Sequence, residues 1–163
     1  MEELSFIVRS RVACLSRNPN QMDLFAVGAD GSAYTAWWNG AWRIWGPLGG
    51  VFPPGTPIAA LSRSPNFMDL FAVAADGAVH CAWWNGNPWR DWYQVGTKTD
   101  FPPGTPIAAL SRNPNHMEIW AVGPDGAVWG AWWNGSWHDW YRIATPQERM
   151  DSQWRSWGAA AGP

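Results

Sequence analysis

The chain has 163 residues, enough for one domain, and it contains 16 Trp, 17 Gly and 14 Pro. Charged residues make up only 15% of the chain, and the formal net charge is −2. This composition excludes a disordered tail, a helical bundle and the basic surface that binds nucleic acid. No apolar stretch approaches the roughly 20 residues that span a bilayer, and residues 1–11 lack a signal-peptide pattern. We therefore expect a soluble protein without membrane insertion, either cytoplasmic or released by a non-classical route.

The two cysteines, Cys14 and Cys81, are too few to form a disulfide framework, and neither has metal-ligand spacing. We expect both to be small buried hydrophobic side chains.

An internal repeat with a period of 46 to 49 residues dominates the chain. Residues 58–86 and 107–135 agree at 20 of 29 positions, and residues 12–40 form a third copy. We therefore predict one propeller-forming unit over residues 1–163, with repeats at about 11–57, 58–106 and 107–145 and terminal strand pieces at 1–10 and 146–163.

Each repeat shows the same order of turn motifs. An S-R-x-P-N segment comes first, and an Asp-Gly pair, a W-W-N-G segment and a W-x-x-W pair follow it. Asp-Gly and Asn-Gly tolerate the positive φ of tight hairpins, so these motifs divide each repeat into four short antiparallel strands. Residues 22–27 and 32–38 are apolar on both alternating faces, which is typical of a sheet covered on both sides. The predicted fold is all-β, with three β-propeller blades of four strands.

An F-P-P-G-T-P segment at residues 52–57 and 101–106 links successive repeats, and Phe6 holds the matching place before the first one. Residues 154–158 resemble residues 42–46, which suggests the last strand of a further, incomplete repeat. A closed propeller needs about four blades or more, so an open arc of three leaves two aromatic faces for association. We expect a homodimer that closes the ring. The rival explanation is a fragment of a longer propeller.

Together these motifs resemble the seven-bladed propeller lectins of the Photorhabdus type, whose blades share the S-R-x-P-N, Asp-Gly, W-W-x-G-x-W and W-x-x-W pattern. The resemblance covers residues 12–143. It implies binding of fucose and related sugars, including O-methylated ones, in pockets between blades. The hairpins are also similar to the W-D-G-x-G-W hairpin of shorter fucose lectins, which stack the sugar on aromatic side chains. Asn39, Asn85 and Asn134 stand where those lectins have Asp.

A sugar site needs a flat apolar surface for the ring and a few converging polar groups for its hydroxyls. Propeller topology places the S-R-x-P-N and W-W-N-G turns at the same rim, so Trp, Arg and acidic side chains meet there. The predicted stacking residues are Trp38, Trp42, Trp84, Trp89, Trp133 and Trp137. The predicted hydroxyl partners are Arg17, Arg63 and Arg112 with Asp23, Asp69 and Glu118.

A structural interpretation competes with this one, because many Trp side chains in a propeller fill the space between blades. Alternation places Trp37, Trp83 and Trp132 beside small apolar residues, so we expect these three to be structural. The Arg of each S-R-x-P-N motif could simply pair with a nearby carboxylate. The Asp of each Asp-Gly pair is a turn residue.

Catalysis finds no support, because His80, His116 and His138 occupy three different places in the repeat and form no shared cluster. We expect no enzymatic activity, no metal and no cofactor. Two functional hypotheses remain: a multivalent glycan-binding lectin for fucose or methylated sugars, and a structural or assembly propeller without a ligand.

Overall fold

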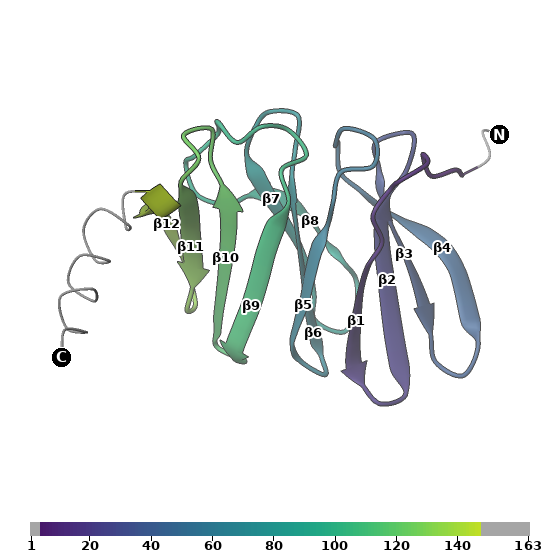
Figure 1. The fold of residues 1–163 in the computed structure, drawn as a ribbon. Coiled ribbons are helices and arrows are strands. Elements are labelled where there is room, and N and C mark those ends of the chain that lie inside the picture. Colours follow the sequence, from purple (N-terminus) through teal and green to yellow (C-terminus); the bar gives the residue numbers. More distant parts are fainter. Residues whose placement is uncertain (1–3, 148–163) are drawn as a thin grey trace, which may run out of the picture.

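The computed structural model describes residues 4–147, which form three four-stranded antiparallel sheets that follow one another along the chain (Figure 1). Within each sheet the strands pair in sequence order. We call the sheets blade 1 (β1–β4), blade 2 (β5–β8) and blade 3 (β9–β12). The predicted fold class is confirmed: the chain is all-β and is built from propeller blades.

The strand bounds follow the predicted division of each repeat into four. Blade 1 consists of β1 (Ala13–Asn18), β2 (Gln21–Val27), β3 (Ala33–Trp38) and β4 (Trp42–Gly49). Blade 2 consists of β5 (Ala59–Ser64), β6 (Phe67–Val73), β7 (Val79–Trp84) and β8 (Arg90–Gln94). Blade 3 consists of β9 (Ile107–Asn113), β10 (His116–Val122), β11 (Val128–Trp133) and β12 (Trp137–Ala144).

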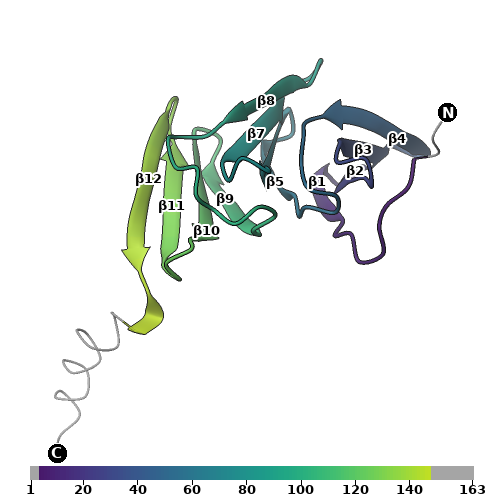
Figure 2. The same ribbon diagram turned by 90° about the horizontal axis from the view of Figure 1, so that it is seen from above.

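The three sheets fan out from their first strands. Strands β1, β5 and β9 lie against one another, whereas β4, β8 and β12 spread apart (Figure 2). The turns β1–β2 and β3–β4 of blade 1 lie at one rim, and the β2–β3 turn lies at the opposite rim (Figure 1). The predicted shared rim of the S-R-x-P-N and W-W-N-G turns is therefore confirmed.

The hydrophobic core lies between the blades, because the second strand of each blade is apolar on both faces. Phe25 of β2 is fully buried in a cluster with Leu70 of blade 2. Phe71 of β6 is fully buried in a second cluster, with Met117 and Ile119 of blade 3. Burial of such side chains contributes about 1.5–3 kcal/mol each, so each blade depends on its neighbour for its stability.

The linker between blades docks on an Asp-Gly turn. The Phe52 N–H donates to the Gly31 carbonyl at 2.9 Å, and Gly31 has a φ of +82°. A Cβ at Gly31 would lie 2.5 Å from the Phe52 carbonyl oxygen, so both the conformation and the close approach require glycine. The Asp30 side chain accepts from the Ser32 N–H at 3.0 Å, as expected for a turn residue.

The linker phenylalanines pack edge-on against the second Trp of each W-x-x-W pair. The ring centroids lie 4.8 Å apart for Phe52 with Trp92 and 4.9 Å apart for Phe101 with Trp140. Phe6 makes the same contact with Trp45 at 4.9 Å. The predicted equivalence of Phe6 with the linker phenylalanines is confirmed.

One expectation about the cysteines is wrong. Cys81 is fully buried on β7, but Cys14 is exposed on the first strand of blade 1. The predicted repeat of residues 42–46 at residues 154–158 lies outside the described part of the chain. Among the described residues, no helix is long and apolar enough to cross a membrane.

Candidate functional site

The Arg and acidic side chains of the S-R-x-P-N hairpins form ion pairs. The Arg17 Nε donates to Asp23 Oδ2 at 3.0 Å, and the Arg63 Nε donates to Asp69 Oδ2 at 2.7 Å. The hairpin explains the pairing, because Arg lies next to the end of one strand and the acid lies early in the next. In blades 1 and 2 all four side chains are at most 8% exposed. The pairing considered from the sequence is therefore present.

Each of these buried arginines also lies over a Trp of the following blade. The Arg17 Cζ is 4.4 Å from the ring centroid of Trp84, and the Arg63 Cζ is 4.6 Å from that of Trp133. Contacts of this kind between a guanidinium and an aromatic face are worth about 0.5–2 kcal/mol. The predicted stacking residues and the predicted hydroxyl partners therefore meet across the blade boundary, not within one blade.

A cavity of about 480 Å³ lies between blades 1 and 2. Its walls include Arg17, Asp23, Trp37, Gly46, Trp84 and Trp89. We call this space pocket 1–2. It joins a buried ion pair to three indole rings, so it offers polar groups and apolar faces at the scale of a small ligand.

A matching cavity of about 370 Å³ lies between blades 2 and 3, and we call it pocket 2–3. Its walls include Arg63, Asp69, Trp83, Tyr93 and Trp133. The repeat therefore builds the same kind of site twice within the chain. Asp69 lies deepest here. Burial raises the pKa of its carboxyl, and the hydrogen bond and charge of Arg63 act in the opposite direction.

In blades 2 and 3, the first Trp of the W-x-x-W pair packs on a phenylalanine of the preceding blade. Trp89 contacts Phe25 and Trp137 contacts Phe71, both edge-on at 5.8 Å between centroids. These two predicted stacking residues therefore also hold the blades together.

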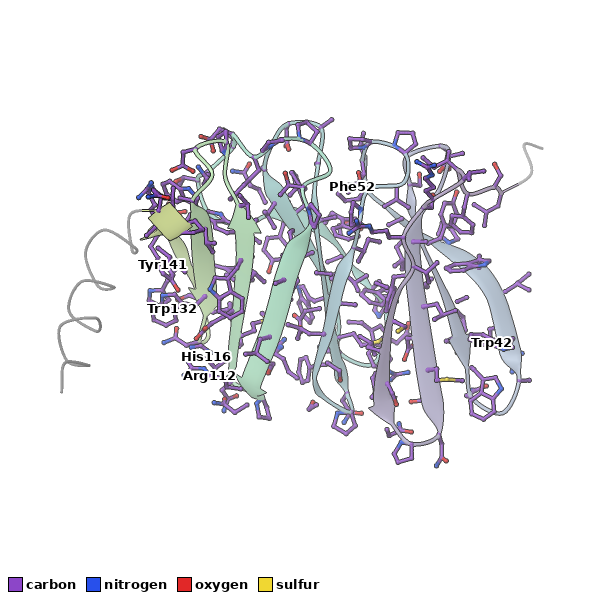
Figure 3. The ribbon with its side chains drawn as sticks, viewed as in Figure 1. Trp42, Phe52, Arg112, His116, Trp132 and Tyr141 are labelled. Atoms are coloured by element: carbon purple, nitrogen blue, oxygen red, sulfur yellow. The ribbon has the colours of Figure 1, made fainter. Side chains whose placement is uncertain are left out.

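Two pairs of predicted site residues, one in blade 1 and one in blade 3, are not brought together with each other. Trp38 and Trp42 belong to the outer face of blade 1, and Arg112 and Glu118 belong to the outer face of blade 3. The Arg112 Nη2 donates to Glu118 Oε1 at 2.6 Å, but the Arg112 side chain is 61% exposed. Figure 3 shows Trp42 at one end of the arc and Arg112 at the other.

Trp37 and Trp83, which we predicted to be structural together with Trp132, line the two pockets. Trp37 is 36% exposed. Their structural role stays a prediction. Trp132 lies at the outer end of blade 3, where His138 stacks on it at 3.5 Å between centroids (Figure 3).

Sequence reasoning also missed the position held by Gly46 in blade 1 and Tyr93 in blade 2. These residues pair with Thr35 and Cys81 at matching places in the two sheets, and each lines its pocket. Because the position varies between repeats, comparison of the repeats was the signal that could have identified it.

A further cavity of about 550 Å³ lies on blade 2 and its linker, with Phe52, Asp76, His80, Asp91 and Trp92 among its walls. In blade 3 the chain itself occupies the matching region. There the Thr97 hydroxyl donates to Asp139, and Lys98 Nζ lies 3.8 Å from the ring centroid of Trp129. This cavity is therefore not repeated in the way that the two inter-blade pockets are. Residues 4–147 contain no group of three or more His, Cys, Asp or Glu that could hold a metal ion.

No family model and no curated protein matches the sequence. Solved structures do match. The BP39L lectin from Burkholderia pseudomallei is 34% identical with a TM-score of 0.79, over 87% of this chain and 43% of that chain. The fucose-specific lectin from Aleuria aurantia is 23% identical with a TM-score of 0.71, over 86% of this chain and 46% of that chain.

A shorter protein matches over nearly its whole length. The fucose lectin from Kordia zhangzhouensis is 19% identical with a TM-score of 0.56, over 82% of this chain and 98% of that chain. The present chain thus shares its fold with β-propeller lectins, and it spans less than half of the first two of these relatives. The Aleuria aurantia lectin is a six-bladed propeller.

Proposed function

We propose that this protein is a lectin that binds fucose or an O-methylated sugar in the pockets between its blades. One observation carries the proposal: a buried Arg–Asp pair faces indole rings across a blade boundary, and the chain builds this arrangement twice. Carboxylate and guanidinium groups suit vicinal hydroxyls, and indole faces suit the C–H surface of a sugar ring.

The similar proteins support the same function. The Aleuria aurantia and Kordia zhangzhouensis proteins are fucose lectins, and the latter was solved in complex with methyl-fucoside. The Photorhabdus-type resemblance of the motifs adds O-methylated sugars to the candidate ligands. Since these neighbours are lectins, we propose that the protein binds glycans without acting on them.

A glycan array with the labelled protein tests this function, with free methyl α-L-fucoside as competitor. We expect selective binding to fucosylated or methylated glycans. Trp89→Phe keeps a ring against Phe25 but removes the indole N–H, so it should weaken binding about tenfold. The control is Trp140→Phe, an indole on blade 3 that lines neither inter-blade pocket, and it should bind as the wild type does. A blank array from the folded protein would support the alternative of a propeller without a ligand.

We further propose that two copies close a six-bladed ring. The outer face of blade 1 presents Trp42, which is 54% exposed, and the outer face of blade 3 presents Arg112, Leu110 and Val122. By analogy with the internal boundaries, Arg112 of one copy would lie over Trp38 of the other. The ring would then have two further pockets, each built from both copies.

Sedimentation equilibrium tests the ring, and we expect twice the chain mass. Val122→Glu should convert the protein to a monomer, because it places a charge in an apolar contact. The control Val51→Glu changes a side chain that is 81% exposed in the linker between blades 1 and 2, away from both outer faces, and should leave the mass unchanged. A wild-type monomer would contradict the ring and favour a longer propeller as the native context.

A further inference from the structure

At the boundary between blades 2 and 3, polar residues that line pocket 2–3 are already hydrogen-bonded to other side chains. The Trp137 indole N–H donates to the Tyr93 hydroxyl at 2.9 Å. Arg63 holds both oxygens of Asp69, through Nε at 2.7 Å and Nη2 at 3.3 Å. The ring of Phe67 also lies 4.7 Å from the Arg63 guanidinium. A sugar entering this pocket would have to displace hydrogen bonds that the chain makes to itself.

Fewer of the equivalent groups are engaged in pocket 1–2, although Arg17 still pairs with Asp23. Gly46 stands at the position of Tyr93, and within residues 4–147 the Trp89 indole N–H has no hydrogen-bond acceptor. Arg17 binds Asp23 through a single contact at 3.0 Å, so Asp23 Oδ1 accepts no hydrogen bond from the arginine. Gln21 replaces Phe67 and accepts from the Asn18 amide at 2.9 Å. The cavity is also larger, at about 480 Å³ against about 370 Å³.

A difference of this kind decides binding, because a hydrogen bond to a ligand adds little affinity when it replaces one already made within the protein. The Tyr93 hydroxyl already accepts from Trp137, which is the contact that a sugar hydroxyl could make. The corresponding donor in pocket 1–2, Trp89, lacks an acceptor among the described residues. Trp89 and Trp137 pack in the same way on Phe25 and Phe71, so the two indoles are directly comparable.

We propose that the residue at this position, Gly46 or Tyr93, determines which inter-blade pocket binds a sugar. The inference rests on the proposed lectin function. Pocket 1–2 is the binding site. Pocket 2–3 is also a cavity, of about 370 Å³, but Tyr93 already accepts from the indole N–H beside it. In blade 3 the same register position holds Tyr141, which pairs with Gly130 as Tyr93 pairs with Cys81. A pocket formed between two copies would therefore also contain a tyrosine, which leaves one binding site per chain.

The local structure permits an exchange of these residues. A Cβ built on Gly46 has no other heavy atom within 4 Å, and Gly46 is not among the glycines with positive φ. Tyrosine therefore fits there without backbone strain. Tyr93 is 37% exposed, so its replacement by glycine opens the pocket from its rim.

Isothermal titration with methyl α-L-fucoside tests the proposal. We expect one bound sugar per chain in the wild type, at least tenfold weaker binding in Gly46→Tyr, and two bound sugars per chain in Tyr93→Gly. Circular dichroism and thermal unfolding verify that each variant is folded. Tyr93→Phe is a second variant: it keeps the ring but frees the Trp137 N–H, so it separates the hydroxyl from the bulk of the side chain.

The outcomes distinguish this inference from the lectin function itself. Two or more equivalent sites per wild-type chain, or unchanged binding in Gly46→Tyr, would overturn the role of this position and leave the lectin function standing. A wild type that binds neither methyl α-L-fucoside nor any glycan on the array would overturn both.

Discussion

The boundaries between blades and the two outer faces of the arc contain the same motifs in different surroundings. The Arg side chains of the S-R-x-P-N motifs are 8% and 7% exposed in blades 1 and 2, but Arg112 in blade 3 is 61% exposed. The difference arises because blades 2 and 3 cover the first two arginines, whereas residues 4–147 contain no fourth blade to cover Arg112. Whether a side chain is buried in this fold therefore depends on the neighbouring blade. The described residues form two complete blade boundaries, and the outer faces of blades 1 and 3 resemble the two halves of such a boundary.

The largest expected difference in the free energy of unfolding is between substitutions of a buried ring and of its counterpart on the outer face. Phe71→Ala removes a fully buried ring that packs on Trp137, so we expect a loss of about 3–5 kcal/mol in the free energy of unfolding. Trp120→Ala changes the equivalent position of blade 3, against which no further blade of residues 4–147 packs. Its loss should be below about 2 kcal/mol. Urea denaturation at dilution measures both values, and equal losses would contradict the comparison.

A second pair of substitutions compares the buried and exposed arginines. Arg63→Met leaves the Asp69 carboxylate, with only 2% of its side chain exposed, without its cation. We expect a loss of about 3 kcal/mol at neutral pH. Arg112→Met removes the cation of Glu118, whose side chain is 21% exposed, so this variant should lose less than about 1 kcal/mol in the free energy of unfolding. Similar losses in the two variants would show that burial does not set the strength of these pairs.

The pH dependence of Arg63→Met sharpens the same test. Burial already raises the pKa of Asp69 above its ordinary value, and removal of Arg63 should raise it further. A carboxyl with a folded pKa above its unfolded value favours folding while it is protonated. The variant should therefore recover stability relative to the wild type as the pH falls to about 4, and lose it as the pH rises. Denaturation curves between these pH values measure the recovery, and a constant difference would contradict it.

A smaller effect concerns one hydrogen bond across the boundary between blades 1 and 2. The Trp92 indole N–H donates to the Leu48 carbonyl at 3.1 Å, whereas the equivalent Trp45 of blade 1 has no acceptor among the described residues. Trp92→Phe should cost about 1 kcal/mol more than Trp45→Phe in the free energy of unfolding. Chemical denaturation of both variants measures the difference, and its absence would mean that this bond adds no stability.

The smallest effect concerns a contact that lies within one blade and needs no neighbour. The Arg142 Nε donates to Asp125 Oδ2 at 2.8 Å, and this bond, with the Trp129 indole, lowers the pKa of Asp125 to about 2. At pH values above the pKa that Asp125 has in the unfolded chain, its lowered pKa stabilises the fold. This stabilisation is lost as the pH falls towards 2. Carboxyl NMR titration should report a pKa of about 2 in the wild type and a higher one in Arg142→Gln. An unchanged pKa in the variant would contradict this assignment.

The sequence predicted the fold well because its signals are local. Asp-Gly and Asn-Gly turns mark the hairpins, and repetition of the motifs revealed the equivalence of Phe6 with Phe52. The site was predicted less completely. The Arg17–Asp23 pair spans six residues and could be anticipated from the hairpin, but the contact of Arg17 with Trp84 crosses a blade boundary. Alternation along a strand distinguishes its two faces, but it does not say which face lies against a neighbouring blade and which lines a cavity.

The sequence alone thus determined the three blades of residues 4–147, their strand order and the rim where Trp, Arg and acidic residues gather, since each follows from turn chemistry repeated at a fixed period. The tertiary structure decided that Cys14 is exposed, that Trp37 lines a pocket, and that Tyr93 occupies the space left open beside Gly46. These properties depend on contacts between side chains of different strands and blades. Their physical basis is the packing of one sheet against the next, which no local pattern in the chain records.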